Sequence, residues 1–239
     1  MTENNTEKTW CVVPAAGIGS RMQQERPKQY LPFRSATILD MTLSRLLASQ
    51  RFEKIVVCLK RGDPYWTSSE YASDERIIVA DGGDERADSV LNGIQAVKAY
   101  AGPSDWVLVH DAARPCVRLV DIEQLINTAS NQQQGAILAV PIHDTIKYVS
   151  AGVALKTFDR SSLWRALTPQ IFRLDDLEQA LLTAKLNGME VTDEASAIEQ
   201  LNKAVLIVEG QADNIKITCP DDLVLADFYI QQQEKEQCE

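Results

Sequence analysis

The chain has 239 residues, of which 45% are hydrophobic and 24% charged, and its formal net charge at pH 7 is −10. This composition supports a packed core and excludes a disordered chain, and the acidic balance argues against nucleic-acid binding, which needs a basic surface. No apolar run approaches the ~20 residues that cross a bilayer, and the N-terminus lacks the apolar centre of a signal peptide, so we expect a soluble, cytoplasmic protein without a membrane partner.

The first half of the chain alternates strand-like and helix-like patterns. Short apolar runs predict strands at residues 10–13, 54–59, 76–80, 106–109 and 135–140. Apolar residues at helical spacing predict helices at 38–47, 90–97 and 121–133. This order predicts a Rossmann-like α/β fold, with a mostly parallel sheet and helices on both faces. Ligands in such folds bind outside the carboxyl ends of the strands, so the informative residues should directly follow strands.

Residues 141–170 break this alternation. Two short alternating segments around a Ser-Ala-Gly turn predict a β-hairpin that projects from the sheet. Because a lone hairpin is marginally stable, this arm needs a surface to pack against. We expect that surface to be a second subunit, the alternative being a hairpin folded over its own domain.

The rest of the chain returns to the earlier alternation. Helices are predicted at 174–187 and 192–201, the second capped by Thr192 or Asp193. Residues 205–208 and 214–218 are predicted to return to the sheet, and a final helix from Pro220 runs into a polar tail that we expect to be frayed. No repeat and no linker is visible, so we expect residues 1–239 to form a single domain.

The first predicted strand leads into a loop of small residues, PAAGIGSRM, and the cations Arg21, Arg26 and Lys28 follow within a dozen positions. Small residues let backbone N–H groups approach an anion, and Pro27 constrains the segment that presents Lys28. The loop is not a dinucleotide fingerprint, because Met22 stands where the third glycine belongs, and it is not a Walker loop. We expect it to hold a phosphate group, the alternative being an ordinary strand-to-helix turn.

Two further loops follow predicted strands. In DGGDER, Gly82 and Gly83 can admit a flat base against the backbone, with Ser89 nearby, although the carboxylates there also suit the positive end of the next helix. In HDAARP, a buried Asp111 needs a cation, a metal ion or a hydroxyl partner; an internal ion pair with Arg114 is the simplest alternative. We expect the neighbouring histidine, His110, to be a satisfied core residue rather than a catalytic base.

Metal binding by a cysteine and histidine cluster is not expected. The five cysteines are scattered without a CxxC pair, and the chain has only two histidines. A magnesium ion held mainly by substrate phosphates stays compatible with the sequence.

Eight motifs in a fixed order resemble one family. PAAGIGSRM, PKQY, DGGDERADSV, VHDAARP, PIHDTIK, ALTPQIF, TDEAS and GQADNIKIT span nearly the whole chain. Together they resemble the 2-C-methyl-D-erythritol 4-phosphate cytidylyltransferases of non-mevalonate isoprenoid biosynthesis. The resemblance implies a nucleotidyltransferase-type fold and transfer of a cytidylyl group from CTP to methylerythritol 4-phosphate, giving 4-diphosphocytidyl-2-C-methyl-D-erythritol and pyrophosphate. It also implies Mg²⁺ or another divalent cation as cofactor, and a homodimer joined through the 141–170 arm.

The resemblance further implies roles for individual residues. Arg21 and Lys28 are expected on the triphosphate and Lys216 near the α-phosphate, as the catalytic cations. Asp111 is expected to serve the sugar and the metal ion. The cytidine-binding residues are expected to be Ala15, Ala16, Gly17, Gly82, Asp84 and Ser89. The acceptor-binding residues are expected to be Arg114, Thr145, Arg160 and Thr168, with Arg160 reaching across from the partner subunit. Ile18 departs from the family pattern, and Arg26 has no implied role and is expected to be solvated.

The expected mechanism is direct in-line attack of a substrate phosphate oxygen on the α-phosphate of CTP. No strong base is needed, because a phosphate monoester is largely ionised near pH 7, and the chain shows no histidine dyad or nucleophile array. Three alternatives remain. The first is a cytidylyltransferase for another polyol phosphate, such as ribitol 5-phosphate. The second is a catalytically dead nucleotide-binding protein. The third is an NAD-dependent dehydrogenase, which Met22 disfavours.

Overall fold

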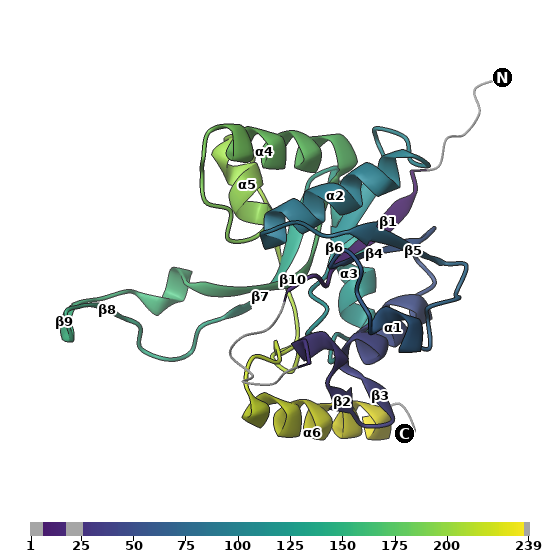
Figure 1. Cartoon of the computed structure of the whole chain (residues 1–239). Helices are drawn as coiled ribbons and strands as arrows, with labels where there is room; N and C mark the ends of the chain where they lie inside the picture. The colour runs from purple at the N-terminus through teal and green to yellow at the C-terminus, as the bar shows by residue number, and fades with distance from the viewer. Residues whose placement is uncertain (1–6, 18–25, 237–239) are drawn as a thin grey trace.

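The computed structural model describes residues 7–17 and 26–236. Its centre is a seven-stranded sheet (Figure 1) formed by β1 (Thr9–Pro14), β4 (Ile55–Leu59), β5 (Ile77–Asp81), β6 (Trp106–Val109), β7 (Ala136–Pro141), β10 (Trp164–Arg173) and β11 (Leu206–Glu209). The spatial order is β11-β7-β10-β6-β1-β4-β5. Neighbouring strands are parallel except β10, which is antiparallel to both β6 and β7. The prediction of a mostly parallel α/β sheet is therefore confirmed.

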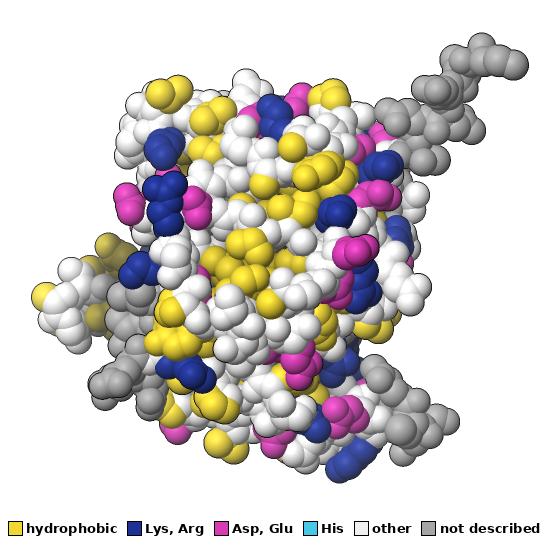
Figure 2. Space-filling view, turned by 45° about the vertical axis from the view of Figure 1, so that its right-hand side comes forward, with side chains coloured by type: hydrophobic (Ala, Val, Ile, Leu, Met, Phe, Trp, Pro, Cys, Tyr) yellow, Lys and Arg dark blue, Asp and Glu magenta, His cyan; other side chains and the backbone are white. Residues whose placement is uncertain are grey.

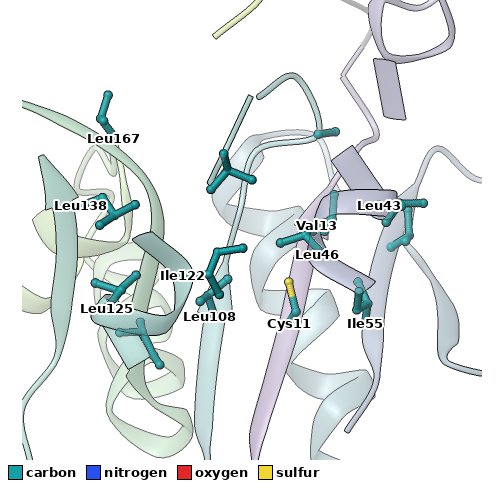
Figure 3. Close-up of a cluster of buried hydrophobic side chains, with 14 of the residues drawn as sticks. Cys11, Val13, Leu43, Leu46, Ile55, Leu108, Ile122, Leu125, Leu138 and Leu167 are labelled. Atoms are coloured by element: carbon teal, nitrogen blue, oxygen red, sulfur yellow. The ribbon is translucent and has the colours of Figure 1, made fainter. Parts of the chain in front are cut away.

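Helices cover both faces of this sheet, because its central strands are apolar on both sides. One face carries α1 (Ile38–Ala48) and α3 (Leu119–Gln132), and the other carries α2 (Arg86–Lys98), α4 (Leu174–Leu186) and α5 (Glu194–Gln200). Alternation along β1 serves both layers, since Cys11 and Val13 join the cluster with α1 and α3 while Trp10 and Val12 join the cluster with α2 and α4. Figure 3 shows Cys11 and Val13 among leucine and isoleucine side chains of the first cluster.

The predicted hairpin is confirmed, but the predicted arm of residues 141–170 extends too far, because residues 164–170 belong to β10 of the central sheet. The hairpin consists of β8 (Lys147–Ser150) and β9 (Val153–Thr157), which are antiparallel to each other and project away from the sheet (Figure 1). Every residue of both strands is exposed. A short helical turn, η4 (Arg160–Ser162), then leads the chain into β10.

Smaller elements connect the main ones. They are η2 (Lys28–Tyr30), β2 (Pro32–Phe33), β3 (Ala36–Thr37) and η3 (Trp66–Ser68). Helix α5 begins where the carboxylate of Asp193 accepts a hydrogen bond from the N–H of Ser196, so Asp193 rather than Thr192 is its cap.

Two expectations about the last part of the chain are wrong. Residues 214–218 form no strand; the segment has a single backbone hydrogen bond to the loop after β6, from the N–H of Ile217 to the oxygen of Ala113. Residues 231–236 of the polar tail are helical to the end of α6 (Pro220–Glu236) rather than frayed, and residues 237–239 lie outside the described ranges. The helix holds because Gln233 is buried and donates to the carbonyl oxygen of Cys116, and Glu236 pairs with Arg118.

On the face drawn in Figure 2, lysine and arginine side chains lie among aspartates and glutamates rather than in one basic field. Within the described ranges, no helix is long and apolar enough to span a bilayer.

Candidate active site

A cavity of about 200 Å³ opens at the carboxyl ends of the parallel strands. It is bounded by the loops after β1, β5 and β6, the edge at which an α/β sheet binds its ligands. Eight of the predicted site residues line it, namely Ala15, Ala16, Gly17, Lys28, Asp84, Ser89, Asp111 and Lys216. The structure thus brings together residues that lie up to two hundred positions apart. Arg21, the remaining predicted catalytic cation, lies outside the described residues.

Beside the cavity, the loop after β5 packs closely on β4 and on the loop after β1. The N–H of Gly82 donates to the carbonyl oxygen of Leu59 at 2.6 Å, which fixes the loop after β5 against β4. A Cβ atom on Gly82 would lie 2.3 Å from the Cβ of Ala16, and one on Gly83 would lie 2.2 Å from the Cβ of Asp88. Glycine is therefore required at both positions by space rather than by backbone dihedral angles.

Ser89 secures this loop. Its hydroxyl oxygen accepts a hydrogen bond from the N–H of Gly83 at 3.0 Å, and its hydroxyl donates to the carbonyl oxygen of Glu85 at 3.2 Å. One lone pair of the hydroxyl is left to accept a further hydrogen bond. Glu85 and Asp88 form a capping box at the start of α2, so part of the acidic character of this loop does stabilise a helix N-terminus, as the simpler interpretation held.

Lys28 reaches the cavity from η2, which is tied to the glycine loop. Its neighbour Gln29 is buried and donates from its side-chain amide to the carbonyl oxygen of Ala15 at 2.6 Å. Arg26 is exposed, as expected, and its guanidinium also lies 5.2 Å from the centre of the Tyr65 ring. This contact attaches the start of the turn to the body of the protein.

Asp111 is the charged centre of the site. Its carboxylate accepts from the Nε of Arg86 at 2.9 Å, the Nζ of Lys216 at 2.9 Å and the Nε of Arg114 at 3.4 Å. Burial raises the pKa of this carboxyl, but the combined attraction of Arg86, Lys216 and Arg114 is the larger effect, so the pKa lies well below its usual range. Asp111 is thus ionised and shared by three cations, rather than held only by the internal pair with Arg114.

His110 is a satisfied core residue, as predicted. It is fully buried, and burial lowers its pKa to about 4. Its Nε2 lies 3.1 Å from the carbonyl oxygen of Arg114, which can only accept, so Nε2 carries the proton and Nδ1 accepts from the hydroxyl of Thr168 at 3.2 Å. The Thr168 oxygen in turn accepts from the N–H of Asp111 at 3.1 Å. Thr168, a predicted acceptor-binding residue, is buried and holds this loop.

The other predicted acceptor-binding residues lie toward the arm. Arg114 borders the cavity region through Asp111 and donates to the carbonyl oxygen of Asn214 at 2.8 Å. Thr145 and Arg160 are exposed at the base of the arm and do not line the cavity; Arg160 donates to the carbonyl oxygen of His143 at 2.6 Å. Within one chain the structure therefore leaves these two residues apart from the rest of the predicted site.

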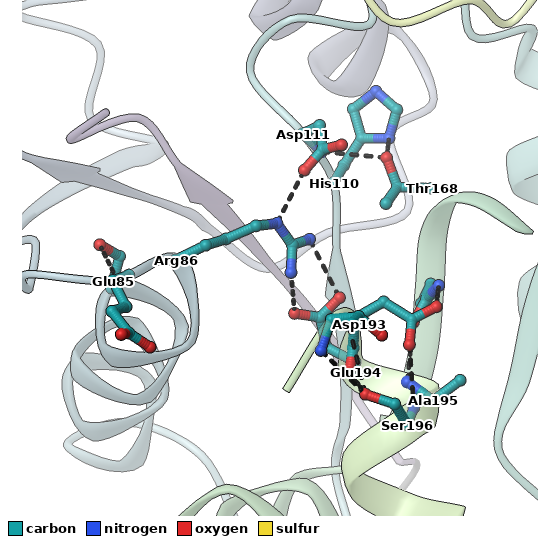
Figure 4. Close-up of polar contacts among 12 residues, drawn as sticks. Glu85, Arg86, His110, Asp111, Thr168, Asp193, Glu194, Ala195 and Ser196 are labelled. Carbon is teal, nitrogen blue, oxygen red and sulfur yellow. Dashed lines mark hydrogen bonds and ion pairs between the residues drawn. The ribbon is translucent and has the colours of Figure 1, made fainter. Parts of the chain in front are cut away.

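Two residues of the site were missed by sequence reasoning. Arg86 donates to Asp111 and also forms a double hydrogen bond with the carboxylate of Glu194, at 2.6 and 3.0 Å (Figure 4). Both lie in motifs that the sequence singled out, DGGDERADSV and TDEAS, but their partnership spans 108 positions. The only indication in the sequence was that the two residues have opposite charges. A glutamate next to a predicted helix cap is usually exposed, so the complete burial of Glu194 could not be predicted.

The donor set is compatible with one hard cation. Among the residues that the structure describes, no group of three histidine, cysteine or acidic side chains could hold a metal ion. Asp111 is an ionised oxygen donor at the cavity wall, which fits a magnesium ion whose other ligands come from phosphates and water.

Comparisons with known proteins agree across nearly the whole chain. A sequence model of the 2-C-methyl-D-erythritol 4-phosphate cytidylyltransferase family matches residues 9–232. Proteins of that name from Photobacterium profundum and Aliivibrio fischeri (strain ATCC 700601 / ES114) are 46% and 48% identical, covering 97% and 99% of this chain and 100% and 99% of their own. A crystal structure of that enzyme from Francisella tularensis is 38% identical with a TM-score of 0.82, covering 93% of this chain and 100% of its own.

Proposed function

The chain belongs to the 2-C-methyl-D-erythritol 4-phosphate cytidylyltransferase family, and from this premise we propose how its residues carry out the reaction. The protein is a nucleotidyltransferase that transfers a cytidylyl group from CTP to 2-C-methyl-D-erythritol 4-phosphate. The observation that carries the residue assignment is the convergence of Lys28, Asp111 and Lys216 with the glycine wall on one cavity.

We place the cytidine against the glycine wall. Its flat base is placed in the part of the cavity that is lined by the Ala15–Gly17 loop and Gly83, a wall whose shape depends on the close packing of Gly82 on Ala16. The free lone pair of the Ser89 hydroxyl accepts from the exocyclic amine of cytosine, a donor that uracil lacks. Asp84 lines the same cavity and is assigned to the cytidine with them.

The cations serve the phosphates. Lys28 and Arg21 are assigned to the triphosphate and Lys216 to the α-phosphate, where the acceptor's phosphate oxygen attacks in line. A new oxygen–phosphorus bond forms while the bond to the β-phosphate bridge breaks, and pyrophosphate leaves. Two anions must approach each other, so positioning and charge neutralisation dominate the catalysis. The cluster of Arg86, Arg114 and Lys216 with Asp111 and Glu194 contains three cations and two carboxylates, a surplus of one positive charge that favours anions.

The acceptor side of the site is completed by a second chain in this proposal. Arg114, Thr145, Arg160 and Thr168 are assigned to methylerythritol phosphate, Arg160 coming from the partner of a homodimer. The arm supports a dimer because Tyr148, Val149, Val153 and Leu155 are each at least 53% exposed on it. Thr168 contributes by fixing the Asp111 loop, since its hydroxyl is already bonded on both sides.

A divalent cation, Mg²⁺ or a similar ion, is assigned to the CTP phosphates with Asp111 as its protein ligand. When bound, it would neutralise phosphate charge and polarise the oxygens of the reacting group. Asp111 suits this role because three neighbouring cations keep it ionised.

We further propose that residues 1–239 act as one domain, with the segment between β7 and β10, residues 142–163, as the arm. We place the protein in the cytoplasm, where its nucleotide substrate is made, and assign it no nucleic-acid or membrane partner.

The test is pyrophosphate release with CTP, ATP, GTP or UTP and with each of two acceptors, methylerythritol 4-phosphate and ribitol 5-phosphate. We expect turnover with CTP and methylerythritol 4-phosphate alone. Faster turnover with ribitol 5-phosphate would reassign the acceptor, and no turnover with any pair would indicate a dead site.

A further inference from the structure

We propose that Glu194 and Arg86 form a positioning pair that fixes the carboxylate of Asp111, with Arg86 at the cavity wall and Glu194 behind it. The inference rests on the role proposed above for Asp111. Neither residue was predicted from the sequence to serve the reaction; Arg86 lines the cavity, whereas Glu194 does not.

The pair joins two helices that approach from different parts of the chain. Arg86 is the first residue of α2, and Glu194 is the first residue of α5. In Figure 4 the Arg86 side chain extends from α2 and lies between Asp111 and Glu194. Its Nη1 and Nη2 donate to the two carboxylate oxygens of Glu194, at 2.6 and 3.0 Å, and its Nε donates to Oδ1 of Asp111 at 2.9 Å.

The N–H groups of Arg86 are divided between Glu194 and Asp111, and this division determines how Asp111 is held. The planar guanidinium commits its two terminal nitrogens to Glu194, so only Nε is directed at Asp111. Oδ1 of Asp111 thus receives one N–H from Arg86, while Lys216 and Arg114 approach Oδ2. The orientation of the carboxylate is set by this arrangement, and an Arg86 freed from Glu194 would be able to turn its fork onto Asp111.

Burial makes the pair sensitive to the loss of either member. The Glu194 side chain is 0% exposed and that of Arg86 is 28% exposed. Burial lowers the pKa of Arg86, but Glu194 and Asp111 raise it more strongly, to well above its usual value. Removing one member leaves the other as a buried charge without its counter-ion, which destabilises the fold for reasons unrelated to catalysis. A test by single truncations alone would therefore confuse stability with positioning.

Other contacts already join α2 to the same layer of helices. Lys98 pairs with Glu178 of α4 at 2.6 Å; Lys98 is exposed, Glu178 is partly buried, and neither residue lines the cavity. It offers a matched control, because Glu178→Gln also breaks an ion pair of α2 without touching Asp111.

The decisive variant removes both charges at once. Arg86→Met with Glu194→Met leaves no unpaired buried charge, and such replacements often retain stability. Arg86→Lys is the second variant, since it keeps a cation beside Glu194 but lacks the planar fork. Asp111→Asn serves as the reference for the proposed role of Asp111, and Glu178→Gln is the control. Each protein is measured for Tm, for the Kd of CTP by calorimetry with Mg²⁺, and for kcat and KM.

We expect the double variant and Arg86→Lys to keep a Tm within a few degrees of the parent, while CTP binding weakens and kcat falls, each about 10- to 100-fold, as when an outer-shell partner is lost. Glu178→Gln should match the parent in Kd and kcat. The positioning role is overturned if Asp111→Asn is impaired while either the double variant or Arg86→Lys binds and turns over CTP like the parent. Parental activity of Asp111→Asn would instead overturn the proposed role of Asp111, and the inference with it.

Discussion

The side-chain amide of Gln29 holds the carbonyl oxygen of Ala15 at 2.6 Å, and this bond ties the turn that presents Lys28 to the loop that walls the cavity. Gln29→Met preserves side-chain length but leaves the Ala15 carbonyl without its buried partner, a loss of ~1–3 kcal/mol. We expect the KM for CTP to rise about 10-fold. Gln134→Met, which removes an exposed amide-to-carbonyl bond to Ala204, is the control and should leave KM unchanged. An unchanged KM in Gln29→Met would show that the loop is held without this bond.

Lys28→Ala should lower kcat by ~10²–10³-fold, the effect of losing one donor that stabilises the transition state. The half-buried Lys54, which donates to the carbonyl oxygen of Glu75, offers a control of equal charge in Lys54→Ala. Steady-state kinetics, with the concentration of CTP varied at saturating acceptor, measure kcat and KM for both variants. A raised KM with an intact kcat would contradict a transition-state role.

Gly82→Ala should abolish most CTP binding, because its Cβ would lie 2.3 Å from Ala16 and 3.2 Å from the carbonyl oxygen of Leu59. The backbone must shift, and the shift moves the wall assigned to the base. Calorimetry with CTP measures the loss. Gly102→Ala is the matched control, since its Cβ would meet nothing closer than 4.0 Å. Binding by Gly82→Ala at parental strength would exclude this wall as the base site.

Arg160→Ala should weaken binding of methylerythritol phosphate far more than binding of CTP. If Arg160 acts across the dimer, mixing Arg160→Ala with Lys28→Ala chains creates one site with both residues intact. The mixture should then be more active than either variant alone. A mixture that exchanges subunits yet is no more active than the variants would place Arg160 in the site of its own chain.

His110 should make stability fall in mild acid. Its pKa is about 4 in the folded protein and ~6.5 in an unfolded chain, so between these values the unfolded state binds the extra proton. Unfolding is therefore favoured as pH falls from about 6.5 to 4, by about 1.4 kcal/mol per pH unit for this one group. Urea unfolding in EDTA should show that His110→Gln lacks this part of the slope. Parallel slopes for parent and variant would contradict a buried neutral histidine.

The parallel part of the fold was predictable because burial on both faces leaves continuous apolar runs, as in Ile55–Leu59 and Trp106–Val109. Strand β10 was missed because a proline, Pro169, interrupts its sequence, and prolines argue against central strands. The structure accommodates it with a shift of register between Ala166 and Gln170.

Polar partnerships at long range were the least predictable part of the site. The alternation of Ile215 and Ile217 imitates a strand, yet the segment is fixed by Asn214, which is fully buried and donates to the carbonyl oxygen of Thr168. Likewise, Arg86 looks like an ordinary helix start until α5 brings Glu194 beside it. Local sequence indicates whether a segment favours a helix or a strand, while these contacts depend on how segments far apart in the chain are brought together.

The contact between Gly82 and Ala16 has a consequence for inhibition. A compound that fills the proposed base site would press on the Ala15–Gly17 loop and on Gly83, and the shape of this wall depends on Gly82, which tolerates no side chain against Ala16. Resistance usually arises by exchanging a contacting side chain, but here the substitution that would exclude the drug also closes the site to the nucleotide. Escape at this wall is therefore expected to carry a direct loss of fitness, which makes it a more durable target than the cation side chains around it.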